Sequence, residues 1–175
     1  MPIERSLTPV DVEHIGSIAR QLLDSSTLCA IATISPDAWP HINTAYFAWS
    51  DSWDIIWLSE PAAQHSRNVR ANSAVAVAVY DSHQMWGESD RGIQLFGRAR
   101  ELSGVTSRNA EALYARRFAA FAQTNLSAYR FYRCRPQRMK LFDERALGTA
   151  IFVTARIRRD RQLAWERTDI YQPAP

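Results

Sequence analysis

The residues best suited to chemistry lie in a short polar segment between two apolar, strand-like runs. The first run ends at Leu58 and Ser59, and the second extends from Ala74 to Tyr80. Between them the chain gathers arginines, a histidine, a serine and amides: Gln64, His65, Ser66, Arg67, Asn68 and Arg70. A partly buried phosphate needs charge-assisted donors of this kind together with backbone N–H groups. We therefore expect residues 64–70 to form an anion cradle, a segment that holds a phosphate group beside a sheet. The alternative is the solvated face of a surface turn.

The hydrophobic pattern predicts that strands, for the most part, position this cradle. Thr8 and Pro9, followed by apolar residues at helical spacing, predict a helix at about 9–24. Alternating apolar residues and turn signals predict strands at 28–34, 40–49, 53–59, 74–80 and 92–102, a helix at 107–122, and strands at 128–135, 139–143 and 149–158. This order favours an antiparallel β-barrel with flanking helices over alternating βαβ units. We expect a single domain over residues 1–175, with the barrel at about 28–158 and a C-terminal tail at 159–175.

Composition excludes several other classes of protein. The 175 residues suit one domain that folds without a disulfide or a structural metal. Cys29 and Cys134 are far apart and lack metal-ligand spacing, so we expect buried apolar residues there and no metal site. The glycine fingerprints of Rossmann and P-loop nucleotide sites are missing from the sequence. Any nucleotide-like cofactor must therefore be held by other residues.

Charge and hydropathy also limit the partners. The formal net charge is +3, and the arginine cluster at 156–161 has no recognisable groove-reading element beside it, so we expect no nucleic-acid partner. The sequence shows no cleavable signal and no apolar run of roughly 18 residues. We expect a soluble, cytoplasmic protein with no membrane partner.

Four motifs, in order, resemble the pyridoxamine 5′-phosphate oxidase-like family of FMN-binding split-barrel proteins. They are Ala-Thr-Ile-Ser-Pro-Asp-Ala-Trp-Pro-His-Ile-Asn at 32–43, Ile-Trp-Leu-Ser at 56–59, His-Ser-Arg-Asn-Val-Arg-Ala-Asn-Ser at 65–73, and Gly-Ile-Gln-Leu-Phe-Gly-Arg-Ala at 92–99. The segment Tyr114 to Phe118 resembles the small YhbP-like members. The resemblance implies a mainly β, antiparallel, Greek-key-like split barrel with flanking helices. It does not extend to the true oxidase, because residues 163–173 offer no convincing counterpart of the Arg and His that clamp the substrate phosphate there.

The resemblance also implies which residues contact the cofactor. They are the strand residues His41, Ile42, Asn43 and Thr44, the strand end Leu58 and Ser59, the cradle residues Gln64, His65, Ser66 and Arg67, and Gln94 at the flavin ring or ribityl chain. The usual Arg-Lys pair of the family falls on Gln64 and His65. We therefore expect Arg67, or a protonated His65, to supply the positive charge. Two alternatives stay open: a hydrogen-bonded histidine at the barrel mouth for His41, and a half-buried strand residue for Gln94.

The function implied by the resemblance is that of a homodimeric flavoprotein with FMN at the subunit interface. Such a protein would be an oxidoreductase of the flavin-reductase type, acting on a small organic molecule. Because the isoalloxazine ring carries this chemistry, no catalytic residue is predicted. The alternatives are a reductase that uses deazaflavin F420 on the same barrel, and a non-catalytic protein that binds flavin or haem, with His41, His65 or His83 as the candidate haem ligand.

Overall fold

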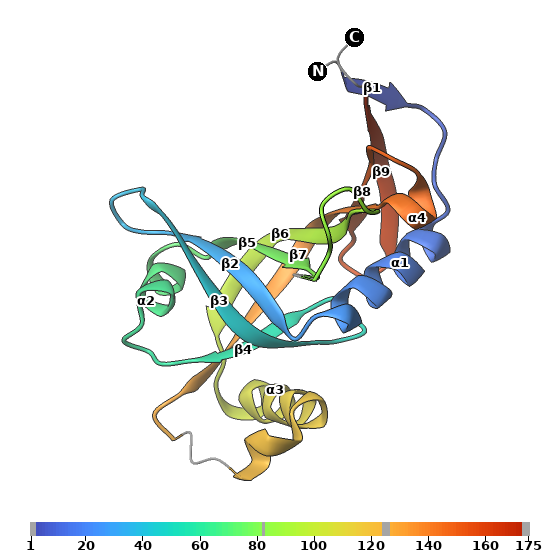
Figure 1. Ribbon diagram of the computed structural model, residues 1–175. Coiled ribbons are helices and arrows are strands. Elements are labelled where there is room, and N and C mark those ends of the chain that lie inside the picture. The colour runs from blue at the N-terminus through green and yellow to red at the C-terminus, as the bar shows by residue number, and fades with distance from the viewer. Residues whose placement is uncertain (1–2, 82, 124–126, 173–175) are drawn as a thin grey trace. The chain divides into compact units, whose positions relative to one another are not determined.

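The computed structural model describes residues 3–81, 83–123 and 127–172, and strands dominate them. The strands are β1 (Ile3–Ser6), β2 (Leu28–Ile34), β3 (Pro40–Trp49), β4 (Ile55–Ser59), β5 (Ala74–Tyr80), β6 (Arg91–Glu101), β7 (Arg130–Asp143), β8 (Ile151–Ile157) and β9 (Leu163–Tyr171). The helices are α1 (Val12–Ser25), α2 (Gln64–Ala71), α3 (Gly104–Arg117) and α4 (Glu144–Leu147), with a 3₁₀ helix η1 (Ala119–Gln123). Figure 1 shows this arrangement along the chain.

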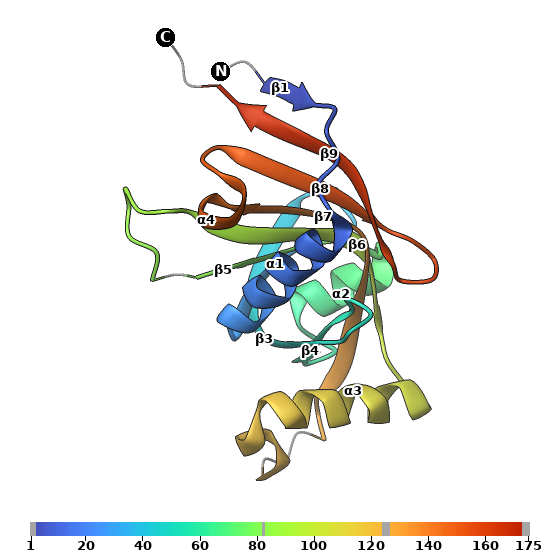
Figure 2. The same cartoon turned by 90° about the vertical axis from the view of Figure 1, so that its right-hand side faces the viewer.

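Six of the strands form a closed, mainly antiparallel barrel. They pair in the order β7-β4-β3-β2-β5-β6, and a pairing of β6 with β7 closes the ring. Strands β8, β9 and β1 extend the sheet from β7, and Figure 2 shows β1 alongside β9. The predicted fold class, a split β-barrel with flanking helices, is confirmed.

The chain divides into two compact units, each built from separate segments. The central unit comprises residues 27–77 and 96–136, and the terminal unit comprises residues 1–26, 78–95 and 137–175. Strands β5, β6 and β7 each have residues in both units. The expectation of a single domain stays a prediction.

Alternating polarity explains the hairpin that opens the central unit. In β2 the side chains of Cys29, Ile31 and Thr33 are buried, while the residues between them are half-buried or exposed. β2 pairs in antiparallel register with β3, so that Thr33 lies opposite His41 and Ile31 opposite Asn43. The turn between them places Ala38 at a positive φ of 62°. Both strands have the predicted bounds.

The segment predicted as a polar turn is helix α2. Its N-cap residue is Ala63, which makes no side-chain capping hydrogen bond. Asn68 and Val69 are buried, and α2 packs against β2 and β3, as Figure 1 shows. The helix therefore presents an N-terminus whose first backbone N–H groups lack a capping side chain.

Three other expectations about the elements need correction, and one strand was missed. Residues 128–135 and 139–143 were expected as two strands but form one, β7, which pairs with β4 over 130–134 and with β8 over 138–141; Pro136, which cannot donate to a ladder, lies between the two pairings. The helix expected at 107–122 begins and ends earlier, as α3. Most of the expected tail is strand β9, while residues 173–175 lie outside the described residues. β1 was not predicted.

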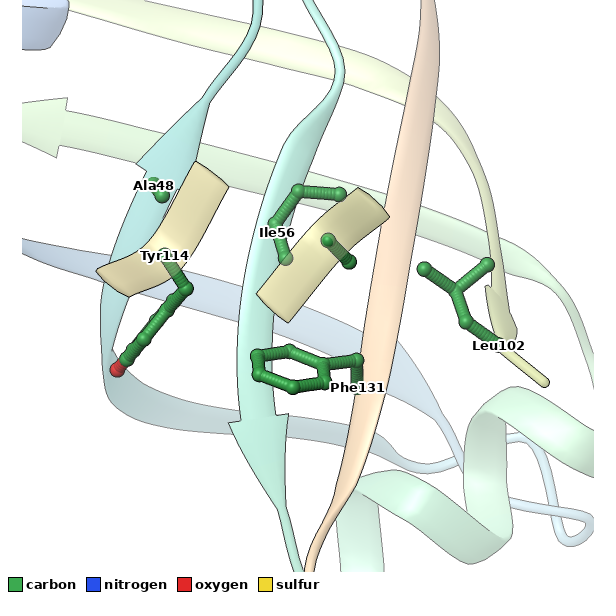
Figure 3. Close-up of a cluster of buried hydrophobic side chains, with 6 residues drawn as sticks. Ala48, Ile56, Leu102, Tyr114 and Phe131 are labelled. Atoms are coloured by element: carbon green, nitrogen blue, oxygen red, sulfur yellow. The ribbon is translucent and has the colours of Figure 1, made fainter. Parts of the chain in front are cut away.

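α3 covers one side of the central unit through a cluster of buried apolar side chains. Figure 3 shows Ala48 on β3, Ile56 on β4 and Phe131 on β7 facing Tyr114 of α3, with Leu102 beside them. The hydroxyl of Tyr114 donates to the backbone oxygen of Tyr46 over 3.4 Å. This cluster fixes α3 against the outer side of β3, β4 and β7.

Candidate functional site

Five of the predicted site residues meet at the N-terminus of α2 in the central unit. His41 comes from β3, Ser59 ends β4, and Gln64, His65 and Ser66 form the first turn of α2. This placement follows from the packing of α2 on β2 and β3. The predicted anion cradle is therefore a helix N-terminus flanked by two strands.

A short hydrogen bond fixes the ring of His65. Its Nε2 lies 2.6 Å from Oγ of Ser59, and Ser66 Oγ donates to Ser59 Oγ over 3.2 Å. Ser59 is 6% exposed and Ser66 is 0% exposed. Both hydroxyls therefore support His65 from inside the barrel, whereas the sequence prediction placed them against the cofactor.

The ring of His41 lies close enough to affect His65. The ring centroids of His41 and His65 are 6.4 Å apart, with the planes inclined by 24°. Burial lowers the pKa of His65 below its ordinary value of 6.5, and the neighbouring His41 lowers it further. Without a ligand, His65 is therefore neutral at pH 7.

Two buried polar atoms on β3 lack a partner among the described residues. They are Nδ1 of His41 and Oδ1 of Asn43, which lie on the same face of the strand. Buried polar atoms are nearly always hydrogen-bonded in folded proteins. A ligand with hydrogen-bonding groups on one edge would satisfy both atoms.

A series of hydrogen bonds between side chains anchors the start of α2 to β2. Asn68 donates through Nδ2 to Thr33 Oγ1 over 3.0 Å and accepts from Gln64 Nε2 over 2.8 Å. Gln64 Oε1 in turn accepts from the guanidinium of Arg67, which also donates to the backbone oxygen of Ala62. Arg67 itself is exposed, so its charge lies at the rim of the cradle.

The other predicted site residues do not join this group. Ile42 and Thr44 lie exposed on the face of β3 opposite to His41. Leu58 points away from Ser59 and packs against the α3 cluster. Gln94 is an exposed residue of β6 in the terminal unit.

Sequence reasoning missed three residues that support the site, Thr33, Tyr132 and Glu101, and did not predict the role of Asn68. Thr33 and Asn68 tie α2 to β2, and Asn68 is 0% exposed although the alternative interpretation placed it on a solvated face. Tyr132 is buried, and its hydroxyl donates to Glu101 over 2.9 Å. The spacing of Gln64 and Asn68, four positions apart, was the one local signal, because it places both on one face of a helix.

Within residues 3–81, 83–123 and 127–172, no group of three or more His, Cys, Asp or Glu side chains is arranged to hold a metal ion. No helix in the same ranges is long and apolar enough to cross a membrane.

Comparison with known proteins identifies one sequence family. The model of that family, described as pyridoxamine 5′-phosphate oxidase, matches residues 18–143. No curated protein matches the chain by sequence.

Solved structures share the fold at low sequence identity. A protein related to general stress protein 26 of Bacillus subtilis, from Clostridium acetobutylicum and of the pyridoxine phosphate oxidase family, is 13% identical with a TM-score of 0.64, over 85% of this chain and 97% of that one. A haem-binding protein from Mycobacterium smegmatis is 14% identical with a TM-score of 0.63, over 97% and 91% of the two chains. An F420 reductase is 22% identical with a TM-score of 0.51, over 69% and 94%.

Proposed function

Because the chain belongs to the pyridoxamine 5′-phosphate oxidase family, we propose that it binds FMN with the phosphate at the N-terminus of α2. The observation that carries this proposal is the uncapped first turn of α2 beside His65 and Arg67. Backbone N–H groups at a helix N-terminus, together with cationic side chains, are a suitable set of donors for a phosphate.

The charge at this site differs from that of the Arg-Lys pair usual in the family, in which both side chains are permanently cationic. Arg67 supplies one lasting positive charge at the rim, while His65 becomes cationic only when an anion raises its pKa. Since Ser59 engages Nε2 of His65, the contact with the phosphate is assigned to Nδ1. FMN binding is then coupled to the uptake of a proton by His65.

The orphaned atoms on β3 support a ring cofactor rather than free phosphate. An isoalloxazine edge carries both donors and acceptors, and His41 Nδ1 and Asn43 Oδ1 are buried without partners among the described residues. FMN bound there would supply hydride or electron transfer to a small organic molecule, as an oxidoreductase of the flavin-reductase type. The protein would hold and orient the ring.

We also propose that two copies of the chain associate, with the cofactor between them, and that the protein works in the cytoplasm. One face of the β2-β3 hairpin is apolar and open: Leu28 is opposite Tyr46, and Ala32 is opposite Ile42. Leu28 is 45%, Tyr46 58% and Ile42 68% exposed. A patch of this kind favours association with another protein surface.

F420 and haem remain the alternative cofactors, because proteins of similar fold are named for binding or using them. An F420 reductase and a haem-binding protein are among the similar structures, at identities that support the fold alone. His41 and His65 are the nearest pair of candidate haem ligands, but Nε2 of His65 is bonded to Ser59. This bond favours FMN over haem.

Absorbance and titration test the proposal. Purified protein is mixed in turn with FMN, riboflavin, F420 and haem, and binding is followed by flavin fluorescence or absorbance. FMN is expected to bind more tightly than riboflavin, because only FMN carries the phosphate. Equal affinity for both would place the phosphate elsewhere, and binding of haem or F420 without FMN would replace the proposal.

A further inference from the structure

A row of buried hydroxyl groups connects the cradle to the carboxylate of Glu101 at the end of β6. From the cradle it runs through His65, Ser59, Ser66, Tyr132 and Glu101. Ser66 makes a side-chain hydrogen bond with Tyr132, and Tyr132 donates to Glu101 over 2.9 Å. Ser59, Ser66 and Tyr132 are 6%, 0% and 0% exposed. Three hydroxyls shielded from water therefore separate the histidine from the carboxylate.

The far end of this row opens to solvent. Glu101 is one-third exposed and lines a cavity of about 580 Å³ beside the start of α3, together with Leu102, Ser103, Ser107, Glu111 and Phe131. Arg70 lies 3.4 Å from the Glu101 carboxylate. Glu101 can therefore exchange protons with water, while the hydroxyls behind it cannot.

We propose that Glu101 and His65 exchange a proton through the hydroxyls of Tyr132, Ser66 and Ser59, so that Glu101 delivers and removes the proton of His65 at the cradle. Both side chains act as positioning and proton-relay groups for the anion. The proposal rests on the proposed function in that the anion is taken to be the FMN phosphate.

The proton transfer balances without any further reactant. Starting from a cationic His65, the Nε2–H bond breaks and Ser59 Oγ gains that proton. The proton of Ser59 passes to Ser66 Oγ, that of Ser66 to Tyr132, and that of Tyr132 to the Glu101 carboxylate. The result is a neutral imidazole and a carboxylic acid. Because a hydroxyl both donates and accepts and its hydrogen rotates, the same row carries a proton in the reverse direction.

Other charged groups also act on His65. Burial and His41 on β3 lower its pKa, and Arg67 on α2 places a second positive charge at the rim of the cradle. Arg70, also on α2, partly offsets the charge of Glu101. Within the described residues around this row, Glu101 is the carboxylate joined to His65 by hydrogen bonds. It is therefore the group that can pass a proton between His65 and the solvent side.

The test follows the His65 ring by NMR in cofactor-free protein, with the resonance assigned by its loss in His65→Gln. Glu101→Gln keeps the hydrogen bond to Tyr132 but cannot take up a proton. Tyr132→Phe keeps the carboxylate but interrupts the row. Glu111→Gln removes another carboxylate of the same cavity and is the matched control.

The rate at which the His65 ring exchanges its Nε2 proton with water is expected to fall in Glu101→Gln and in Tyr132→Phe and to stay unchanged in Glu111→Gln. An unchanged exchange rate in Glu101→Gln overturns the proposal. Slower exchange in Glu101→Gln without slower exchange in Tyr132→Phe also overturns it, since the proton would then not pass through the row of hydroxyls.

A parallel FMN titration separates this inference from the proposed function. Protein that binds FMN, with a His65 proton-exchange rate that no variant alters, keeps the function and loses the relay. Protein that shows the slower exchange but never binds FMN keeps the relay and loses the function.

Discussion

Asn68 and Thr33, 35 positions apart in the chain, are joined by a buried hydrogen bond of 3.0 Å that ties α2 to β2. The same amide of Asn68 accepts from Gln64 in the first turn of α2. The position of the helix N-terminus therefore depends on one buried side chain.

We expect Asn68→Ala to lower the free energy of unfolding by about 1–3 kcal/mol, because it leaves the polar atoms of Thr33 and Gln64 without their partner. FMN affinity is expected to fall as well, since the first turn of α2 loses its anchor. Chemical denaturation and flavin titration measure the two effects. Asn109→Ala, at an exposed position on α3, is the control, with a change within about 0.5 kcal/mol. An unaltered stability in Asn68→Ala would show that the helix is held by apolar packing alone.

Arg67 provides the second test of the cradle. We expect Arg67→Ala to weaken FMN binding by about 1.5–3 kcal/mol through loss of a charge-assisted contact, while leaving riboflavin binding nearly unchanged. Arg116→Ala, at an exposed position on α3, is the control. Equal losses for FMN and riboflavin would show that Arg67 acts on the helix through Gln64 and not on the phosphate.

The pH dependence of FMN binding follows from His65. Burial and His41 hold its pKa below 6.5 in the free protein, and a bound phosphate raises it. Between these two pKa values the complex carries one more proton than the free protein. Affinity is therefore expected to fall as pH rises through this window, with log Kd increasing by about one per pH unit, and to level off below the free-state pKa.

Three controls accompany the pH titration. Riboflavin lacks the phosphate and should show a flat profile over the same range, whereas His65→Gln should keep only the titration of the FMN phosphate, whose second pKa is about 6. Calorimetry in buffers of different ionisation enthalpy should detect proton uptake by the wild-type protein with FMN. An FMN affinity that is constant from pH 5 to 8 would exclude His65 as the phosphate ligand.

The barrel strands could be predicted from the sequence because apolar residues alternate with other residues along them. β2 and β3 have the predicted bounds, since apolar residues recur every second position and Pro36 and Asp37 mark the turn. β9 was not readable in the same way, because its residues are mostly half-buried and its partners β8 and β1 are separate elements. Pro136 also concealed the continuity of β7.

The sequence predicted which residues form the candidate site but not the directions in which their side chains point. The cradle residues were found by their chemistry, yet α2 was taken for a turn, so Ser66 was expected to contact the cofactor and the alternative placed Asn68 on a solvated face. In an eight-residue helix, one face must pack on the sheet, and both residues are fully buried there. Tyr132 and Glu101 were missed because they reach His65 only through contacts between distant parts of the sequence.

Gly97 marks a close approach of β6 to β7. A Cβ atom built at this position would lie 2.6 Å from Cα of Pro136 and would also meet the backbone oxygen of Arg135. Neither backbone atom can move aside alone, so Gly97→Ala is expected to destabilise the protein by about 1–3 kcal/mol or more. Gly92→Ala meets the end of the Phe142 ring, which can rotate, and should cost less. Thermal unfolding ranks the two variants, and the reverse order would refute this reading of Gly97.

The exposed face of the β2-β3 hairpin provides the test of the proposed dimer. Ile42 is 68% exposed and lies opposite Ala32 on this apolar face. Two copies of the 19.9 kDa chain give a species of about 40 kDa, and sedimentation at micromolar concentration is expected to detect it. Ile42→Asp places a charge in the contact and should yield the 19.9 kDa monomer with weakened FMN binding, whereas Ile3→Asp on β1 should leave both properties unchanged. A wild-type monomer that holds FMN would show that one chain completes the site.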